Sequence, residues 1–166
     1  MGRFGAPRSN GCLVRYFLDC EFNGWHGSLI SMALVSENDD SLYLVWGDIP
    51  ETIDPWVEKN VLPLVASIPE YVTAVPVLHG TTQAAEVIAD FLKGDPMPFI
   101  VTDWPDDIRY FCETVIVEPG KMAAIPGLVF QMVRFDAYPT DVEGAVQHNA
   151  YWDAVALRAL FPKRKA

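Results

Sequence analysis

The stretch FLDCEFNG, residues 17–24, sets two acids inside an otherwise apolar run. Residues 13–22 are rich in aliphatic and aromatic side chains, which predicts a buried strand. Burying a carboxylate without a partner is unfavourable by several kcal/mol. Side chains two apart on a strand point to the same face, so Asp19 and Glu21 should converge at one place. Cys20 between them should point into the core on the other face.

The length and composition are typical of one globular domain. The 166 residues can bury a sizeable core, and we expect residues 1–11 to be a flexible leader before a single domain at 12–166. No apolar run approaches the roughly 20 residues of a membrane span, and the N-terminus lacks the apolar segment of a signal peptide. The three cysteines form no CxxC pair, which favours a reducing cytoplasm.

The formal net charge of −10 bears on the partners of the chain. A protein that binds long duplexes without sequence preference normally has a basic surface, because neutralising phosphates dominates its affinity. The charge therefore argues against long-duplex binding. It still allows a protein that grips one nucleic-acid end through bound metal ions.

Apolar patterning and turn signals give the order of the elements. The strands are expected near 13–22, 27–36, 41–47, 98–103 and 127–135, and the helices near 54–63, 82–93, 104–115 and 149–161. The second and third strands should form a hairpin around ENDD, residues 37–40. Strands in a meander, followed by alternating helices and strands, predict an α/β fold with a mixed sheet flanked by helices.

Two of the expected helices begin with acids on their buried side. Asp153 precedes Leu157 by four residues, and Asp107 precedes Phe111 by four, so each acid shares a face with an apolar residue. Asp106 should point more toward solvent. Acids in a first turn also favour the helix dipole without any function. That alternative explains their place along the helix but not the inward face.

Four carboxylates, from Asp19, Glu21, Asp107 and Asp153, should thus meet, and they repel one another unless cations lie among them. Oxygen-rich sites suit Mg²⁺ or Mn²⁺. Two such ions about 4 Å apart are a known arrangement for attack on a phosphodiester. His148, five residues before Asp153, could accept the proton of the attacking water. A D-x-E pair alone recurs by chance, and a lone histidine is more often a plain surface residue.

Three motifs resemble those of the DEDDh 3′–5′ exonucleases, a superfamily that includes ribonuclease T, oligoribonuclease and polymerase proofreading subunits. They are DCE at 19–21, DWPDDIRYF at 103–111 and HNAYWD at 148–153. The resemblance implies a ribonuclease H-like fold, two divalent ions and stepwise release of nucleoside monophosphates from 3′ ends. It also implies metal-ligand roles for Asp19, Glu21, Asp107 and Asp153, and catalytic roles for Glu21 and His148.

Two positions depart from the family pattern. Where the family often has Thr after the Glu of the first motif, this chain has Phe22 followed by Asn23; DxEF is closer to a small exoribonuclease branch. Where the second motif often has Asn, the chain has Asp103, which is either a rival for Asp107 or an extra acid near the metals. Phe22, Asn23, Trp25 and Asp103 are the candidate substrate-binding residues. The aromatic pair could stack on the terminal base, although Phe22 could equally be a core residue.

The leading hypothesis is a metal-dependent 3′–5′ exonuclease acting on the 3′ end of single-stranded nucleic acid, with RNA favoured over DNA. The alternatives are another metal-dependent nucleotide phosphohydrolase and a non-catalytic nucleic-acid-binding module on the same fold. Small members of the superfamily often pair. The apolar segment at 65–78 lacks an obvious burial partner, so we also expect a homodimer, unless this segment covers the sheet.

Overall fold

The computed structural model describes residues 14–125, 127–134 and 141–162. The expected leader at 1–11 lies outside the described residues, and the single domain at 12–166 stays a prediction. None of the helices in the described ranges is both long and apolar enough to cross a bilayer.

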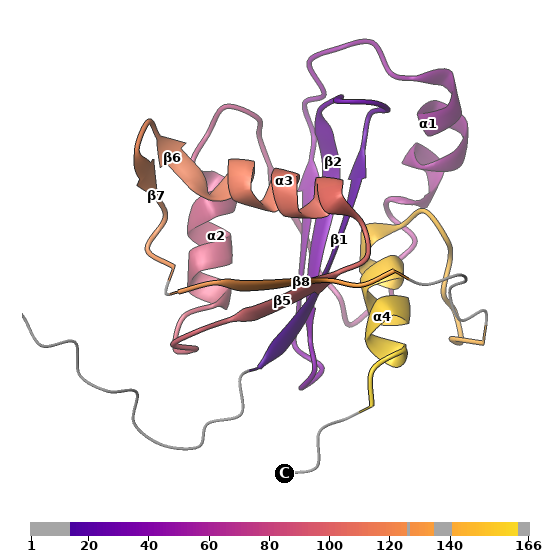
Figure 1. Cartoon of the computed structure of the whole chain (residues 1–166). Coiled ribbons are helices and arrows are strands. Elements are labelled where there is room, and N and C mark those ends of the chain that lie inside the picture. Colours follow the sequence, from indigo (N-terminus) through magenta and orange to yellow (C-terminus); the bar gives the residue numbers. More distant parts are fainter. Residues whose placement is uncertain (1–13, 126, 135–140, 163–166) are drawn as a thin grey trace, which may run out of the picture.

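A mixed sheet of six strands forms the centre of the fold (Figure 1). Its strands are β1 (Arg15–Phe22), β2 (Leu29–Ser36), β3 (Ser41–Trp46), β4 (Ala74–Val77), β5 (Phe99–Thr102) and β8 (Val129–Met132). They lie in the order β4-β3-β2-β1-β5-β8. The pairs β1–β2 and β2–β3 are antiparallel, and the pairs β1–β5, β3–β4 and β5–β8 are parallel. This confirms the predicted α/β fold, and the arrangement is compatible with a ribonuclease H-like fold.

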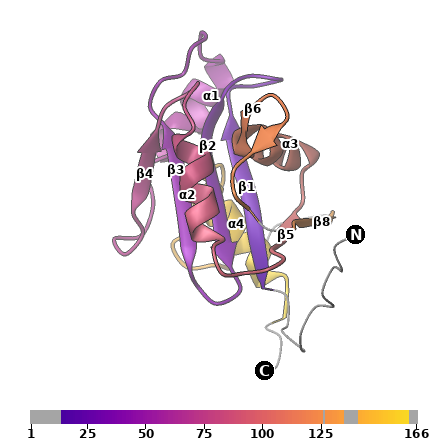
Figure 2. The same cartoon turned by 90° about the vertical axis from the view of Figure 1, so that its left-hand side faces the viewer.

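Helices cover both faces of the sheet. They are α1 (Pro55–Asn60), α2 (Gln83–Phe91), α3 (Pro105–Val115) and α4 (Ala150–Ala159), with a short 3₁₀ turn, η1 (Leu62–Leu64), after α1. Figure 2 shows α2 in front of the sheet and α4 behind it. Ile88 of α2 packs in one core with Leu18 and Leu44, and Ala154 of α4 packs in another with Ala33. Because alanines face alanine there, α4 can approach β1 and β2 closely.

The hairpin of β2 and β3 follows from its sequence. Residues 29–35 are fully apolar apart from Ser31, and every residue of β2 is buried, as expected for a strand covered on both faces. In the turn, the Ser36 hydroxyl accepts hydrogen bonds from the N–H groups of Asn38 and Asp40, both at 3.1 Å. The predicted hairpin is thus present.

Three elements differ from the sequence-based expectations. The first helix ends at Asn60 and η1 continues the turn, because Pro63 cannot extend an α-helix. The edge strand β4 was not predicted; its Pro76 is tolerated because edge strands need not donate on both sides. A small hairpin, β6 (Ile116–Glu118) with β7 (Lys121–Met122), was also missed.

The apolar segment at 65–78 partly packs within the chain. Val72 and Val77 are buried, and the latter belongs to β4. Tyr71 remains 81% exposed. Part of the segment therefore completes the sheet, and the homodimer stays a prediction.

Candidate metal centre

Asp19 and Glu21 lie on the face of β1 that α4 covers. In the β1–β2 pairing they stand opposite Ala33 and Ser31, and Ala33 packs in the core of α4. Cys20 is buried in the core on the other face, as predicted. The pairing shifts between Glu21 and Phe22, so the regular strand ends just after the second acid. The strand thus sets both carboxylates at its end.

The structure gathers the predicted acids into two adjacent groups. One consists of Asp19, Asp103 and Asp107, and the other of Glu21, His148 and Asp153. In each group one potential ligand atom per residue lies within 4.8 Å of the others. Because Asp19 and Glu21 are two apart on one strand face, the two groups are neighbours. All the residues proposed as metal ligands or base therefore meet at one end of β1.

Asp107 is positioned by the junction between β5 and α3. It is 1% exposed in the first turn of α3, and its Oδ2 accepts a 2.5 Å hydrogen bond from the Thr102 hydroxyl at the end of β5. Phe111, one turn later, is fully buried on the same face, as the spacing predicted. Asp103 lies in the same group as Asp107, and its two predicted roles, a rival ligand or an additional acid, stay predictions.

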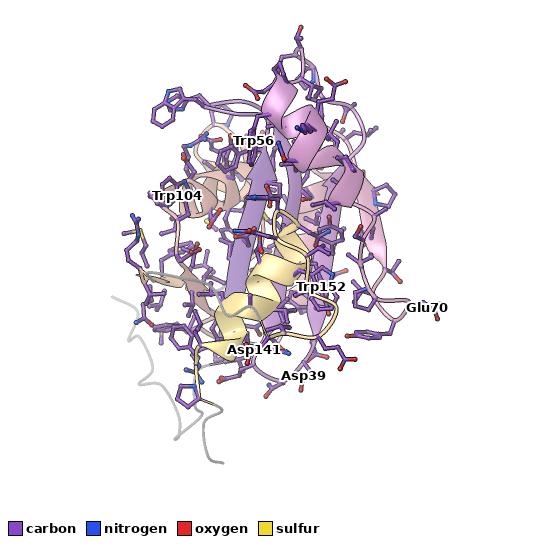
Figure 3. The ribbon with its side chains drawn as sticks, turned by 90° about the vertical axis from the view of Figure 1, so that its right-hand side faces the viewer. Asp39, Trp56, Glu70, Trp104, Asp141 and Trp152 are labelled. Atoms are coloured by element: carbon purple, nitrogen blue, oxygen red, sulfur yellow. The ribbon has the colours of Figure 1, made fainter. Side chains whose placement is uncertain are left out.

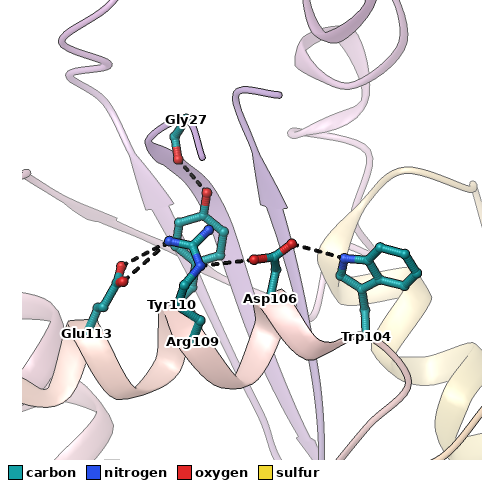
Figure 4. Close-up of polar contacts among 6 residues, drawn as sticks. All are labelled: Gly27, Trp104, Asp106, Arg109, Tyr110 and Glu113. Carbon is teal, nitrogen blue, oxygen red and sulfur yellow. Dashed lines mark hydrogen bonds and ion pairs between the residues drawn. The ribbon is translucent and has the colours of Figure 1, made fainter. Parts of the chain in front are cut away.

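Asp106 faces away from this group. Its Oδ1 accepts a 2.9 Å hydrogen bond from Arg109 Nε, and its Oδ2 accepts one from Trp104 Nε1 at 3.3 Å (Figure 4). Arg109 also contacts Glu113 at 3.3 Å. On the same helix, the Tyr110 hydroxyl donates to the Gly27 carbonyl and ties α3 to the loop after β1.

The cap of α4 holds His148 and Asp153 together. The Asn149 side chain accepts the Trp152 N–H at 3.2 Å and donates to the Leu64 carbonyl at 2.7 Å, which anchors the start of the helix to η1. His148 has a φ of 65°, and its backbone N–H donates to Asp153 Oδ2 at 3.0 Å. Such a backbone conformation is uncommon for a residue with a side chain, and here it lets the amide reach the carboxylate.

The imidazole of His148 packs against an aromatic ring. The Trp56 ring of α1 meets it edge to face, with centroids 5.0 Å apart and planes at 81°. The His148 ring thus contacts Trp56, while one of its nitrogens lies near the carboxylate oxygens of Glu21 and Asp153.

Burial and the charges of neighbouring acids raise the pKa values of all four predicted ligands. Burial, followed by the charges of Asp107 and Asp153, holds the pKa of Asp19 well above its usual range. Burial, then the same two charges, raises the pKa of Glu21 to about 8.

The pKa values of the two helix acids, Asp107 and Asp153, are raised by burial and lowered by hydrogen bonds. Burial raises the pKa of Asp107 to about 8 although the Thr102 hydrogen bond lowers it. Burial likewise raises the pKa of Asp153 to about 7 against the His148 backbone hydrogen bond. Four ionised carboxylates in this cluster are therefore unfavourable by themselves, and bound protons or cations reduce their repulsion.

The chemistry of the donors fits a hard divalent cation. Carboxylate oxygens dominate both groups, and one imidazole joins the second. Such donors suit Mg²⁺ and Mn²⁺ rather than a thiophilic metal. The nearest thiol in sequence, Cys20, is buried on the other face of β1. The cluster is thus a possible metal site, which was the central prediction from the sequence.

The candidate substrate residues near β1 fall in different environments. Phe22 packs on Tyr110, with ring centroids 4.9 Å apart, beside the core of α2 and α3. Asn23 is 6% exposed, and its side chain bonds to Glu51, the Thr52 carbonyl and the Asp54 N–H, so it fixes the loop before α1. Trp25 is 83% exposed. The packing of Phe22 matches the core alternative, and the substrate roles of all three stay predictions.

Sequence reasoning missed two residues that adjoin the cluster. Thr102 orients Asp107, and a strand-end threonine five residues before the acid was its only signal. Trp56 reaches His148 from a distant part of the chain, so no local pattern indicates the contact.

No family model matches the chain, and no curated protein sequence matches it either. The likeness to the DEDDh exonucleases therefore rests on the three motifs and on the geometry of the residues within them.

Proposed function

We propose that the chain is a metal-dependent 3′–5′ exonuclease that releases nucleoside 5′-monophosphates from single-stranded nucleic acid, with RNA preferred over DNA. One observation carries the proposal: Asp19, Glu21, Asp107 and Asp153 come from three separate elements to one end of β1, together with His148. Carboxylates whose pKa values are raised by burial and by neighbouring acids are a feature of functional sites.

Two Mg²⁺ or Mn²⁺ ions would be held by the carboxylates of Asp19, Asp107, Glu21 and Asp153. Asp103 would be an additional acid in the group with Asp19 and Asp107. When bound, such ions lower the pKa of water and offset the charge that develops on a phosphodiester. Thr102 keeps the Asp107 carboxylate oriented through its hydrogen bond. The cap of α4 does the same for Asp153.

His148 is the general base in this proposal. Its imidazole lies in the group with Glu21 and Asp153, and Trp56 restrains it from behind. It accepts a proton from water as the water oxygen bonds to phosphorus and the bond from phosphorus to the 3′ oxygen breaks. The terminal nucleoside 5′-monophosphate leaves, the 3′ oxygen of the shortened strand takes a proton from solvent water, and the imidazole returns its own proton to solvent. The Asp153 carboxylate, bonded to the backbone of His148, keeps the base at a fixed distance from the acids.

The 3′-to-5′ direction comes from the resemblance of the three motifs, and the preference for RNA comes from DxEF at 19–22, which resembles a small exoribonuclease branch. Removal of single nucleotides also suits the charge of the chain. A protein with a net charge of −10 can hold one strand end through cations at a local site, without a long basic surface.

The test is digestion of 5′-labelled RNA and DNA oligomers with Mg²⁺ or Mn²⁺, followed by separation of the products. We expect a ladder that shortens one nucleotide at a time from the 3′ end, no reaction in EDTA, and restoration by added metal. Full activity after exhaustive chelation, or cuts within a circular strand, would contradict the proposal. Hydrolysis of free nucleotides alone would identify a nucleotide phosphohydrolase, and binding without cleavage would identify a binding module.

A further inference from the structure

We propose that Trp104 and Arg134 form a second substrate contact, in which the indole stacks on the base next to the scissile phosphate and the guanidinium binds a phosphate of the same strand. This inference rests on the proposed function and adds a place for the nucleotide that precedes the one being removed. Trp104 lies directly after Asp103 in the chain, at the edge of the metal centre.

The cations of the chain support this assignment. The described ranges contain seven lysines and arginines: Arg15, Lys59, Lys93, Arg109, Lys121, Arg134 and Arg158. Five of them are engaged in ion pairs with carboxylates. Within those ranges, Lys59 and Arg134 make no ion pair. A cation without a carboxylate partner keeps its full charge for a phosphate.

Arg134 is held over an exposed ring. Its Cζ lies 5.2 Å from the centroid of the Trp104 ring, and Trp104 is 45% exposed. A guanidinium on an aromatic face is stabilised by the ring while its N–H groups still point outward to a ligand. An exposed indole with an unpaired arginine at its face offers both contacts that single-stranded nucleic acid uses, base stacking and phosphate binding.

The orientation of Trp104 is fixed by the outer side of α3. Its Nε1 donates to Asp106, which is itself paired with Arg109 (Figure 4). A ring held at its edge loses little conformational freedom when a base stacks on it. In this inference Asp106, the acid of the second motif that faces away from the metal centre, orients the Trp104 ring.

The sheet brings the pair to the metal centre. Arg134 follows β8 by two residues, and the Val133 N–H donates to the Thr102 carbonyl at 2.9 Å. Thr102 also hydrogen-bonds Asp107. The backbone carrying Arg134 thus lies beside the strand end that positions the first acid group, and a strand bound at the acids can reach the pair.

Lys59, the second cation without an ion pair among the described residues, lies in a similar setting on α1. Lys59 is three residues after Trp56, which places them on the same side of the helix, and Trp56 is 53% exposed and contacts His148. Figure 3 shows Trp56 and Trp104 at the same end of the molecule, away from Asp39. Both unpaired cations therefore accompany exposed tryptophans that adjoin the acid groups, which explains how so acidic a chain could hold a polyanion.

The test compares an RNA octamer with the p-nitrophenyl ester of thymidine 5′-monophosphate, which lacks a second nucleotide. For Trp104→Ala we expect KM for the octamer to rise about 5- to 150-fold, the range for one lost base stack. KM for the ester should stay unchanged. Trp104→Phe should retain most of the octamer affinity because the ring remains. Arg134→Gln should lower the slope of log affinity against log salt by about 0.7, the loss of one phosphate contact.

Tyr71→Ala and Lys93→Gln are the matched controls, because they remove an aromatic residue and a cation that are 81% and 80% exposed elsewhere. Both should leave octamer kinetics unchanged. Equal KM values for Trp104→Ala and the wild type, or equal losses on octamer and ester, would overturn the inference. An unchanged salt slope in Arg134→Gln would also overturn it, and this holds even if Trp104→Ala does not fold.

A separate binding measurement distinguishes this inference from the proposed function. Fluorescence anisotropy of a labelled octamer, on an Asp153→Asn background, reports affinity without turnover. If the wild type cleaves neither substrate, the proposed function fails. The Trp104–Arg134 contact is then supported by a loss of octamer affinity in Trp104→Ala and overturned by unchanged affinity.

Discussion

Glu21→Gln should stabilise the metal-free protein at high pH and not at low pH. The substitution keeps the shape of the side chain and removes its charge from the group with His148 and Asp153. The pKa of Glu21 is raised from 4.5 to about 8, chiefly by burial and then by Asp153 and Asp107. Its ionised form is thus disfavoured in the folded protein relative to the unfolded chain.

The size of the stability change follows from three free-energy contributions. A tenfold change in proton affinity corresponds to about 1.4 kcal/mol, so the raised pKa sets an upper limit of about 5 kcal/mol on the penalty. The ligand atoms of Glu21 and Asp153 lie within 4.8 Å of each other, and two unit charges at about that distance repel by about 3.5 kcal/mol at an effective dielectric constant of roughly 20. Burying the amide of glutamine opposes this by about 1–3 kcal/mol. We expect a net gain of about 2 kcal/mol at pH 9, or about 4–8 °C in Tm for a chain of this length.

The stability change caused by Glu21→Gln depends on pH. A carboxyl group whose folded pKa is raised carries no penalty below about pH 4.5, where it is protonated in both states. The penalty grows as the pH rises toward 8 and is complete above it. Thermal melts in EDTA should therefore show Glu21→Gln above the wild type at pH 9, with the difference gone at pH 4.5. Glu70→Gln, an exposed control, should follow the wild type at both pH values. A lower Tm for Glu21→Gln at pH 9 would refute the electrostatic argument.

Three further outcomes are expected. Asp19→Ala and Asp153→Ala should abolish nuclease activity while leaving the Tm in EDTA unchanged or higher, because each removes a ligand and a repelling charge; a large fall in Tm with activity retained would show that these acids are structural. His148→Ala should lower the rate by about 10²–10⁴-fold and leave metal affinity nearly intact, as for loss of a general base; unchanged turnover would remove His148 from the mechanism. The protein should sediment as a homodimer, and a monomeric mass across a wide concentration range would refute this.

Much of the acid cluster could be predicted because its spacing is local. Asp19 and Glu21 share a face by the two-residue period of a strand, and Asp107 and Asp153 share faces with apolar residues four positions later. These periods place side chains on the correct sides of their elements. The convergence of the elements themselves followed from the α/β order of strands and helices.

The residues that could not be predicted depend on contacts between distant parts of the chain. Trp56 meets His148, and Asn149 reaches Leu64, only because α1, η1 and α4 pack at the same end of the sheet. Likewise, β4 is a short edge strand interrupted by Pro76, which masks its period. The hydrogen bonds of Asn23 to Glu51 and to the Asp54 N–H also join distant parts of the chain, so no local pattern indicated them.

The most direct test of the metal centre is a calorimetric titration with Mn²⁺ in the presence of a nucleoside 5′-monophosphate. We predict two ions per chain for the wild type and weaker, incomplete binding for Asp19→Asn and Asp153→Asn, since each variant removes a ligand from one acid group. Glu70→Gln should bind Mn²⁺ like the wild type. Equal Mn²⁺ binding by the wild type and both asparagine variants would contradict a metal centre built from these acids.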